Sequence, residues 1–271
     1  MGKKMEFWMS LGNLSGLHPD SALYDKSLTT KLEALLEHQF VGVSGVTSEM
    51  EVELFNSFGL KYGITVPFPS RIDGEKAVKE ALEKSPESLT IHLGDGTNST
   101  EELDDWLEWL LPKSNDIPMY LEIHRSTATQ DIYRTISLAK LYPEIRFVAD
   151  FSHWYTGLLL GQNFEKKVSF MDPVFERCDV IHGRVANDGC IQPPLNDVRI
   201  NAFYHFKTLW KSVLDKSSSE TNIPFVIELL GHELGYDPGV RQASGIMVDS
   251  TDRWKDALKL KDMVTEWFNE N

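Results

Sequence analysis

The chain has 271 residues, of which 41% are hydrophobic and 25% charged, so it resembles a globular protein long enough to bury a sizeable core. Its formal net charge of −14 argues against nucleic acid or an anionic membrane as the main partner, because both are negatively charged. Cys178 and Cys190 are too few for a disulfide framework, and no apolar run is long enough to cross a bilayer, so we expect a soluble cytoplasmic protein.

Short apolar or β-branched runs alternate with stretches of helical periodicity, a pattern typical of βα units around a parallel sheet. One helical stretch begins at a capping box of Ser99 and Glu102, and others lie near 203–214 and 253–268. Eight strands are predicted, at residues 5–11, 40–46, 61–66, 89–94, 118–124, 145–151, 178–184 and 223–229. With no shift in composition along the chain, these units predict a single (β/α)8 TIM barrel over residues 1–271.

Three segments are longer than plain connections, and each follows a late strand. They are residues 152–166, 185–198 and 231–251. Barrel enzymes assemble their sites from the loops after the strands. We therefore expect these three segments to shape the site and to set its specificity.

Four late strands end in side chains that can bind a metal ion: Glu122, Asp150, His182 and Glu228. Strand alternation points all four into the barrel if their apolar neighbours face the helices. Three converging carboxylates would repel one another, and an uncompensated buried charge costs several kcal/mol. We therefore predict one divalent ion, Mn²⁺, Mg²⁺, Co²⁺ or Zn²⁺, with the imidazole as the fourth ligand. The alternative is that each residue is a solvated side chain or a helix cap, which is less favoured for four successive strands.

Further polar side chains gather near the same strand ends. Those predicted to bind hydroxyl, carboxylate or phosphate groups of a ligand are His92, Asp95, His124, His153 and Arg184. Arg125 is either a further residue of this kind or a surface cation. For His92 a hydrogen-bonded core position is an equal alternative. His232 and Glu233 are weaker candidates for the rim, whereas His18, His38 and His205 are expected to be structural.

Three aromatic residues, Trp8, Phe68 and Trp154, lie where they would either line an apolar side of the pocket or pack in the core, and the core is the default. The Gly94–Gly96 segment lacks the pattern of a phosphate-binding loop, and no GxSxG turn supports a serine hydrolase. Metal chemistry is therefore better supported than phosphate-loop or serine chemistry.

The ends of the late strands carry characteristic segments: Glu-Ile-His-Arg-Ser-Thr at 122–127, Asp-Phe-Ser-His-Trp at 150–154, Ile-His-Gly-Arg-Val at 181–185 followed by Gln192-Pro193, and Ile-Glu at 227–228. These segments resemble those of the xylose-isomerase-like TIM barrels, in particular the sugar phosphate isomerase/epimerase-like proteins. The resemblance covers about residues 88–230. It implies that Glu122, Asp150, His182 and Glu228 are the metal ligands and that His153 contacts the substrate.

The superfamily includes ketose 3-epimerases, inosose dehydratase and metal-dependent apurinic endonucleases. The endonucleases need further zinc ligands, namely a His that ends the third strand and an Asp-x-His after the seventh. Here Val66-Pro67-Phe68-Pro69 follows the third strand, and 185–198 contains Asn187, Asp188 and Asp197 but no Asp-x-His. DNA repair is therefore the weaker alternative. Ser126 stands where the close subset has glycine, which affects the fifth loop rather than the metal.

The sequence thus predicts a metal-dependent sugar, sugar phosphate or polyol isomerase or epimerase, in which Glu122 and Glu228 transfer the proton through an enediolate. The alternatives are a dehydratase or lyase acting on a keto-polyol and a non-catalytic sugar-binding module. No organic cofactor is expected. The expected partner is a small carbohydrate, with neither nucleic acid nor membrane, and a homo-oligomer remains open.

Overall fold

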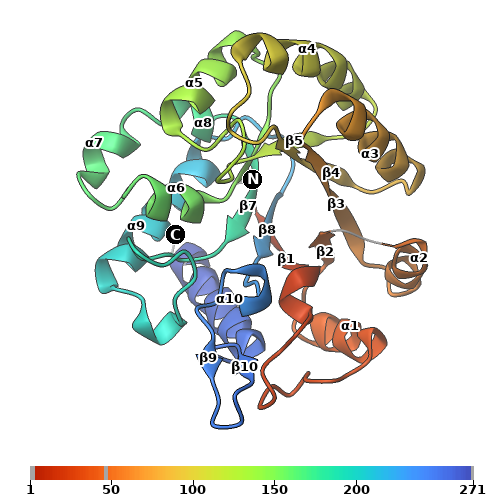
Figure 1. Ribbon diagram of the computed structural model, residues 1–271, viewed down its shortest axis with the longest axis vertical. Helices are drawn as coiled ribbons and strands as arrows, with labels where there is room; N and C mark the ends of the chain where they lie inside the picture. Colours follow the sequence, from red (N-terminus) through yellow and green to blue (C-terminus); the bar gives the residue numbers. More distant parts are fainter. Residues whose placement is uncertain (1–3, 46–47, 270–271) are drawn as a thin grey trace.

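The computed structural model describes residues 4–45 and 48–269, and within them eight parallel strands close into a barrel in chain order (Figure 1). The strands are β1 (Met5–Ser10), β2 (Gly42–Gly45), β3 (Lys61–Phe68), β4 (Ser88–Leu93), β5 (Met119–Glu122), β6 (Phe147–Ala149), β7 (Cys178–Gly183) and β8 (Ile223–Ile227). The barrel closes where β8 pairs with β1, with Phe225 opposite Phe7. The predicted (β/α)8 barrel and its eight strands are confirmed, and only the strand ends shift. Val46, predicted to end the second strand, lies outside the described residues.

Helices surround the barrel (Figure 1). The α-helices of the described residues are α1 (Leu28–Glu37), α2 (Glu49–Ser57), α3 (Arg71–Glu83), α4 (Thr100–Leu110), α5 (Ile132–Leu141), α6 (Phe151–Gly157), α7 (Phe164–Val168), α8 (Asp172–Phe175), α9 (Ile200–Lys216) and α10 (Arg253–Asn269). The predicted capping box begins α4: the Ser99 hydroxyl accepts the Glu102 N–H, and the Glu102 carboxylate accepts the Ser99 N–H. No helix of the described chain is long and apolar enough to cross a membrane.

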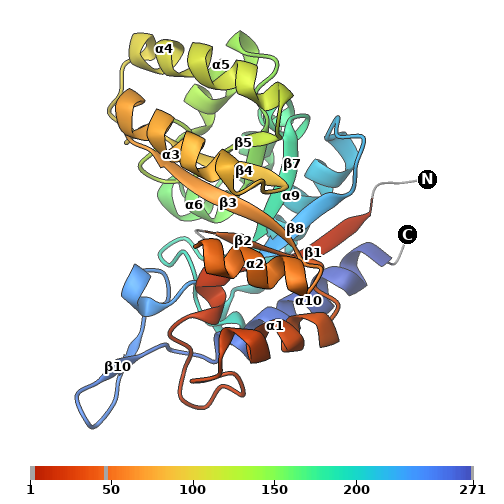
Figure 2. The same cartoon turned by 90° about the vertical axis from the view of Figure 1, so that its right-hand side faces the viewer.

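Short elements occupy several connections. The 3₁₀ turns are η1 (Leu11–Leu14), η2 (Leu111–Asn115), η3 (Leu195–Asp197) and η4 (His232–Leu234). The predicted loop 152–166 is largely helical, because Asp150 accepts the N–H of Ser152 and so caps α6 directly after β6. The segment 231–251 contains a small antiparallel hairpin of β9 (Val240–Arg241) and β10 (Met247–Val248), which projects from the barrel (Figure 2).

One layer of large side chains fills the inside of the barrel: Trp8, Tyr120, Val148, Val180 and Val226. Alternate residues of a strand share a face, so the residue two positions further along also points inward. In β5 to β8 these next positions are Glu122, Asp150, His182 and Glu228. The residues between them belong to the core between strands and helices, namely Leu121, Ala149, Ile181 and Ile227. The predicted inward orientation is therefore confirmed, and the four side chains form the layer above the aromatic and valine layer.

A buried arginine joins the two ends of the chain beside the barrel mouth. Arg253, the first residue of α10, is only 1% exposed and pairs with the carboxylate of Asp249. Its guanidinium also donates to the carbonyl groups of Gly12, Asn13, Ser15, Gly16 and Leu229. Asp249 accepts both the backbone N–H and the ring N–H of His232, each at 2.9 Å. His232 is thus committed to this structural network rather than to the rim.

We expect the fold to lose stability in acid because of the Asp249 carboxylate. Burial by itself would raise its pKa, but the hydrogen bonds from His232 and Arg253 outweigh burial and lower the pKa below 3.8. A lowered pKa in the folded state means that the contribution to stability is complete above the unfolded pKa and is lost as the pH falls from about 4 towards the folded value. We expect the Tm of the wild-type chain to fall more steeply below about pH 4 than that of Asp249→Asn. Equal slopes in thermal melts would contradict this expectation.

Candidate metal centre

Four donor side chains meet at the mouth of the barrel. Glu122 ends β5, Asp150 follows β6, His182 lies in β7 and Glu228 follows β8. Each offers one ligand atom, and these atoms all lie within 4.8 Å of one another. Glu122, Asp150 and His182 are almost completely buried, and the side chain of Glu228 is 15% exposed. The structure therefore brings together the four residues that the strand ends predicted.

This donor set fits a divalent metal ion. Nδ1 of His182 lies 3.2 Å from Glu228 Oε2 and 3.5 Å from Glu122 Oε1. Neither ring nitrogen of His182 makes a hydrogen bond with any described residue, although both are buried. A buried polar atom without a partner is costly, so such an atom in a ring of oxygen donors points to a ligand. Carboxylate oxygens with one imidazole suit Mg²⁺, Mn²⁺, Co²⁺ and Zn²⁺. The cluster is able to hold such an ion.

Arg184 supplies positive charge inside the same cluster. It is fully buried, its Nη2 bonds Asp150 and lies 2.8 Å from Glu228 Oε2, and its Nε donates to Ser152 Oγ at 3.0 Å. The position follows from strand alternation, because Arg184 lies two residues beyond His182 and so keeps the inward direction. The carboxylates are therefore compensated in part by the chain itself. The substrate-binding role of Arg184 stays a prediction.

The neighbouring cations keep the carboxyl groups ionised. Burial by itself would raise the pKa of Glu122, but the charges of His92 and His182 outweigh burial and lower the pKa. Burial would likewise raise the pKa of Asp150 and of Glu228, yet Arg184 lowers the first, and His182 with Arg184 lowers the second. Burial would lower the pKa of His182, whereas the charges of Glu228 and Glu122 raise it well above 6.5. The three carboxyl groups are thus in the form that binds a cation.

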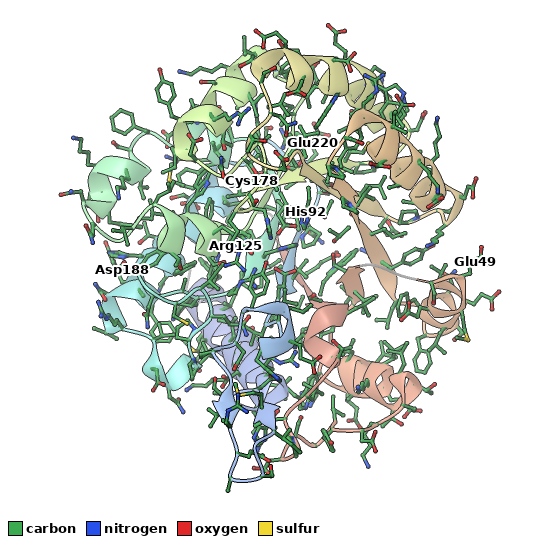
Figure 3. The ribbon with its side chains drawn as sticks, in the orientation of Figure 1. Glu49, His92, Arg125, Cys178, Asp188 and Glu220 are labelled. Atoms are coloured by element: carbon green, nitrogen blue, oxygen red, sulfur yellow. The ribbon has the colours of Figure 1, made fainter. Side chains whose placement is uncertain are left out.

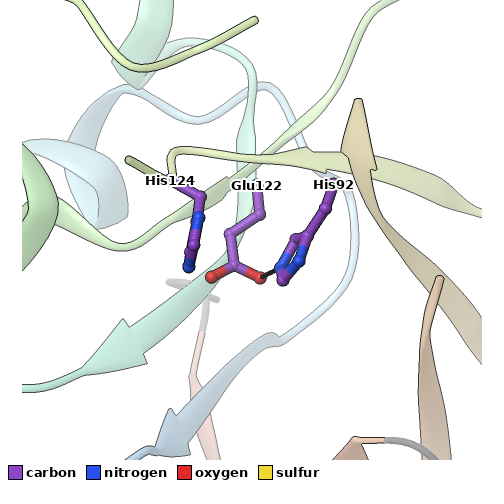
Figure 4. Close-up of side chains that lie close together, drawn as sticks. All are labelled: His92, Glu122 and His124. Atoms are coloured by element: carbon purple, nitrogen blue, oxygen red, sulfur yellow. Dashed lines mark hydrogen bonds and ion pairs between the residues drawn. The ribbon is translucent and has the colours of Figure 1, made fainter. Parts of the chain in front are cut away.

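A second group of donors adjoins the first and shares Glu122 (Figure 4). His92 Nε2 lies 2.9 Å from Glu122 Oε2, and the ring of His92 stacks on that of His124 at 4.5 Å with an angle of 22°. Nitrogen lone pairs lie in the ring plane, so those of stacked rings run side by side instead of converging on one ion. Burial lowers the pKa of His124 to about 4, which leaves that ring neutral. The stack therefore orients Glu122 rather than forming a second metal site.

His153 and Tyr236 lie next to the cluster and contact its side chains. His153 is buried, and its Nε2 lies 3.4 Å from Asp150 Oδ2. Tyr236, in the segment after β8, has its hydroxyl 3.0 Å from His124 Nε2 and its ring centroid 4.4 Å from Cζ of Arg184. Burial raises the pKa of Tyr236 to about 12, so the phenol stays protonated. Tyr236 was not predicted as a site residue from the sequence, because the only signal for it was the length of the segment 231–251.

Asp95 is the predicted site residue with the least support from the structure. Its side chain is exposed, and Oδ1 accepts the N–H of Thr97 at 2.9 Å and the hydroxyl of the same residue at 2.7 Å. Gly94 and Gly96 flank it with φ of 75° and 87°, and this left-handed backbone forms a tight turn after β4. The Asp95 carboxylate thus makes its hydrogen bonds within its own turn.

The remaining aromatic and histidine predictions resolve in favour of structural roles. Trp8 lies in the interior layer of the barrel, Phe68 packs on Trp106, and Trp154 donates from Nε1 to the carbonyl of Thr129 at 2.9 Å. His205 stacks on Phe164. His18 accepts the N–H of Asp20, and His38 packs against Trp254. The core interpretation of the aromatics and the structural interpretation of these histidines are confirmed, while Glu233 is exposed.

No protein-family model and no curated protein matches this sequence. Solved structures match it in fold. A xylose isomerase-like TIM barrel protein from Mycobacterium smegmatis, in complex with magnesium, superposes with a TM-score of 0.58 at 11% identity, covering 98% of this chain and 96% of that one. A xylose isomerase domain protein from Planctomyces limnophilus gives a TM-score of 0.54 at 12% identity, covering 100% and 99%. The predicted resemblance is therefore confirmed at the level of the fold.

Proposed function

We propose that this chain, which shares its fold with the xylose isomerase-like TIM barrel proteins, is a divalent-metal-dependent isomerase or epimerase of a small sugar, sugar phosphate or polyol. The observation that carries the proposal is the meeting of Glu122, Asp150, His182 and Glu228 in one buried cluster. The magnesium in the Mycobacterium smegmatis protein of the same fold supports it. Barrel enzymes place their sites at this end of the strands.

A divalent ion bound by these four residues would polarise a substrate carbonyl and acidify the neighbouring C–H. Glu228 is the natural base, because its side chain is the most exposed of the four and is ionised by its cationic neighbours. Glu122 comes from β5, and His182 lies between the two glutamates, within 3.5 Å of Glu122 and 3.2 Å of Glu228. β5 and β8 are three strands apart around the closed barrel, so the two glutamates approach from different sides. Removal of a proton by Glu228 gives an enediolate, and a proton passed from His92 through the ionised Glu122 to the opposite face gives the epimer.

The other side chains of the mouth have positioning roles in this scheme. His92 holds Glu122 through a hydrogen bond of 2.9 Å and so sets the direction of its carboxylate. His153 has both ring nitrogens buried and free of hydrogen bonds to the described residues, which suits it to bind a substrate hydroxyl. These contacts would fix the substrate carbon between the two carboxylates, and such alignment is a large part of catalysis.

The proposal is tested by proton exchange in Glu228→Gln. A panel of ketopentoses, ketohexoses, their phosphates and hydroxy-keto acids is incubated in D₂O with the Mn²⁺-loaded chain, and deuterium at the α-carbon is measured by NMR. We expect exchange in the wild type and a loss of at least about 100-fold in Glu228→Gln, because a positioned base contributes about 10²–10⁴-fold. Loss of water from the substrate instead of exchange would identify the dehydratase alternative.

The matched control is Glu49→Gln, a change of the same chemistry on an exposed residue at the periphery (Figure 3). This variant is expected to exchange at the wild-type rate. Near-wild-type exchange in Glu228→Gln would contradict the scheme of two glutamates. A wild-type chain that binds Mn²⁺ and sugar without any exchange would be a binding module rather than an isomerase.

A further inference from the structure

Two cationic side chains of the mouth have bonding capacity that the described residues do not use. Arg184 is fully buried, and its Nη1 has no hydrogen-bond partner, whereas Nη2 and Nε are bonded. Arg125 is exposed three residues after Glu122, and its guanidinium makes no hydrogen bond or ion pair within residues 4–45 and 48–269. Leaving a buried donor unsatisfied is costly, so Nη1 of Arg184 points to a ligand that carries an acceptor.

Both guanidinium groups lie against the same tyrosine. Cζ of Arg184 is 4.4 Å and Cζ of Arg125 is 4.8 Å from the ring centroid of Tyr236. Arg125 and His92 both lie near the middle of the barrel in the view of Figure 3. Two like charges around one ring repel each other, and an anion at the mouth relieves that repulsion. Planar guanidinium groups bind carboxylates with two parallel hydrogen bonds, which suits a flat anionic group here.

The formal charges of the mouth favour one negative charge on the ligand. The carboxylates of Glu122, Asp150 and Glu228 are balanced by a divalent ion and Arg184 together. Arg125 then leaves one positive charge in excess among the carboxylates, the divalent ion and the two guanidinium groups. The chain has a formal net charge of −14, which repels anions, so an anion needs a local positive region such as this one in order to bind. A monoanion completes the balance, whereas the dianion of a phosphate exceeds it.

We propose that Arg125 and Arg184 form a carboxylate-binding subsite and that the substrate is a monoanionic sugar acid or a similar hydroxy-keto acid. The inference rests on the proposed metal centre and narrows its substrate class. The carboxylate lies beside Tyr236, and the hydroxyl and carbonyl groups of the same molecule extend towards Glu122 and Glu228. Neutral sugars lack the group that Arg125 recognises.

The test compares three small probes that differ mainly in charge: D-glycerate, glycerol and glycerol 3-phosphate. Their binding to the Mn²⁺-loaded full chain is measured by isothermal titration calorimetry, after Mn²⁺ content has been determined separately. We expect D-glycerate to bind at least about tenfold more tightly than glycerol, because a hydrogen bond to a charged group is stronger than one to a neutral group. Arg125→Gln is expected to remove about tenfold of the affinity for D-glycerate and to leave glycerol unchanged.

The control is Arg199→Gln, because the side chain of Arg199 is 70% exposed and lies outside the metal centre. It should bind all three probes like the wild type. The carboxylate subsite is overturned if Mn²⁺ binds but D-glycerate and glycerol bind equally, or if Arg125→Gln weakens both alike; the metal centre then still stands. Tighter binding of glycerol 3-phosphate than of D-glycerate overturns the monoanionic assignment. Failure to bind Mn²⁺ overturns the metal centre and the charge balance with it.

Discussion

His182→Gln is expected to lower the affinity for Mn²⁺ by at least about 100-fold, since even the loss of a residue that only supports a ligand costs 10–100-fold. His182 is the single nitrogen donor among the four, and its Nδ1 lies within 3.5 Å of both glutamates. Glutamine fills a similar volume but is a weaker metal ligand. Deuterium exchange in any responsive ketose should fall with the loss of metal. The measurement is calorimetric titration with Mn²⁺, accompanied by elemental analysis.

His38→Gln is the matched control for this change. His38 is exposed on the surface and packs against Trp254. The substitution therefore removes an imidazole without changing any residue of the cluster. Its Mn²⁺ affinity should equal that of the wild type. A far-ultraviolet circular dichroism spectrum shows whether each variant keeps its helices. Unchanged Mn²⁺ affinity in a folded His182→Gln would show that the four side chains do not form the metal centre.

Arg253→Met is expected to lower the free energy of unfolding by about 3–5 kcal/mol, because removing one partner of a buried ion pair leaves the other charge uncompensated. The side chain of Asp249 is completely buried, and Arg253 also satisfies carbonyl groups of the η1 region and of the β8 end. Methionine keeps much of the length of the side chain, so loss of packing contributes little. Urea denaturation followed by tryptophan fluorescence measures the change.

The cause of this loss is tested by a second substitution. Adding Asp249→Asn to Arg253→Met removes the unpaired charge, so the double variant should lose less than the sum of the two single variants. Arg241→Gln, in the exposed β9–β10 hairpin, serves as the control and should change stability by less than about 0.5 kcal/mol. A loss below about 1 kcal/mol in Arg253→Met would contradict a stabilising role for the network.

The residues of the candidate metal centre were predictable because their direction depends on a local rule. Side chains alternate along a strand, so a polar residue two positions beyond an inward valine also points inward. Val148 of β6 and Asp150 directly after that strand follow this rule, and Val180 and His182 follow it on β7. The parallel strands all end on one face of the barrel, so polar strand ends meet there. The two facts together identify the cluster without any knowledge of distances.

The path of each chain segment after its strand could not be predicted in the same way. Asp95 was expected at the site, yet its turn lets the side chain bond to Thr97. The segment after β6 was expected to be a long loop, but the cap from Asp150 begins a helix at once. Tyr236 contacts Arg184 and His124 from a segment with no periodic pattern. Such contacts depend on turns and caps whose geometry follows from several residues together.

The sequence by itself determined the barrel, the inward face of each strand and the set of donor side chains, because alternation and strand order are properties of the chain. Only the tertiary structure decided which charges pair across the mouth. The register places Glu122 beside Val148 and His182 beside Val226, so Asp150 and Glu228 lie further along their strands, where Nη2 of Arg184 reaches both. That stagger arises from closing a twisted sheet on itself, and therefore no single strand encodes it.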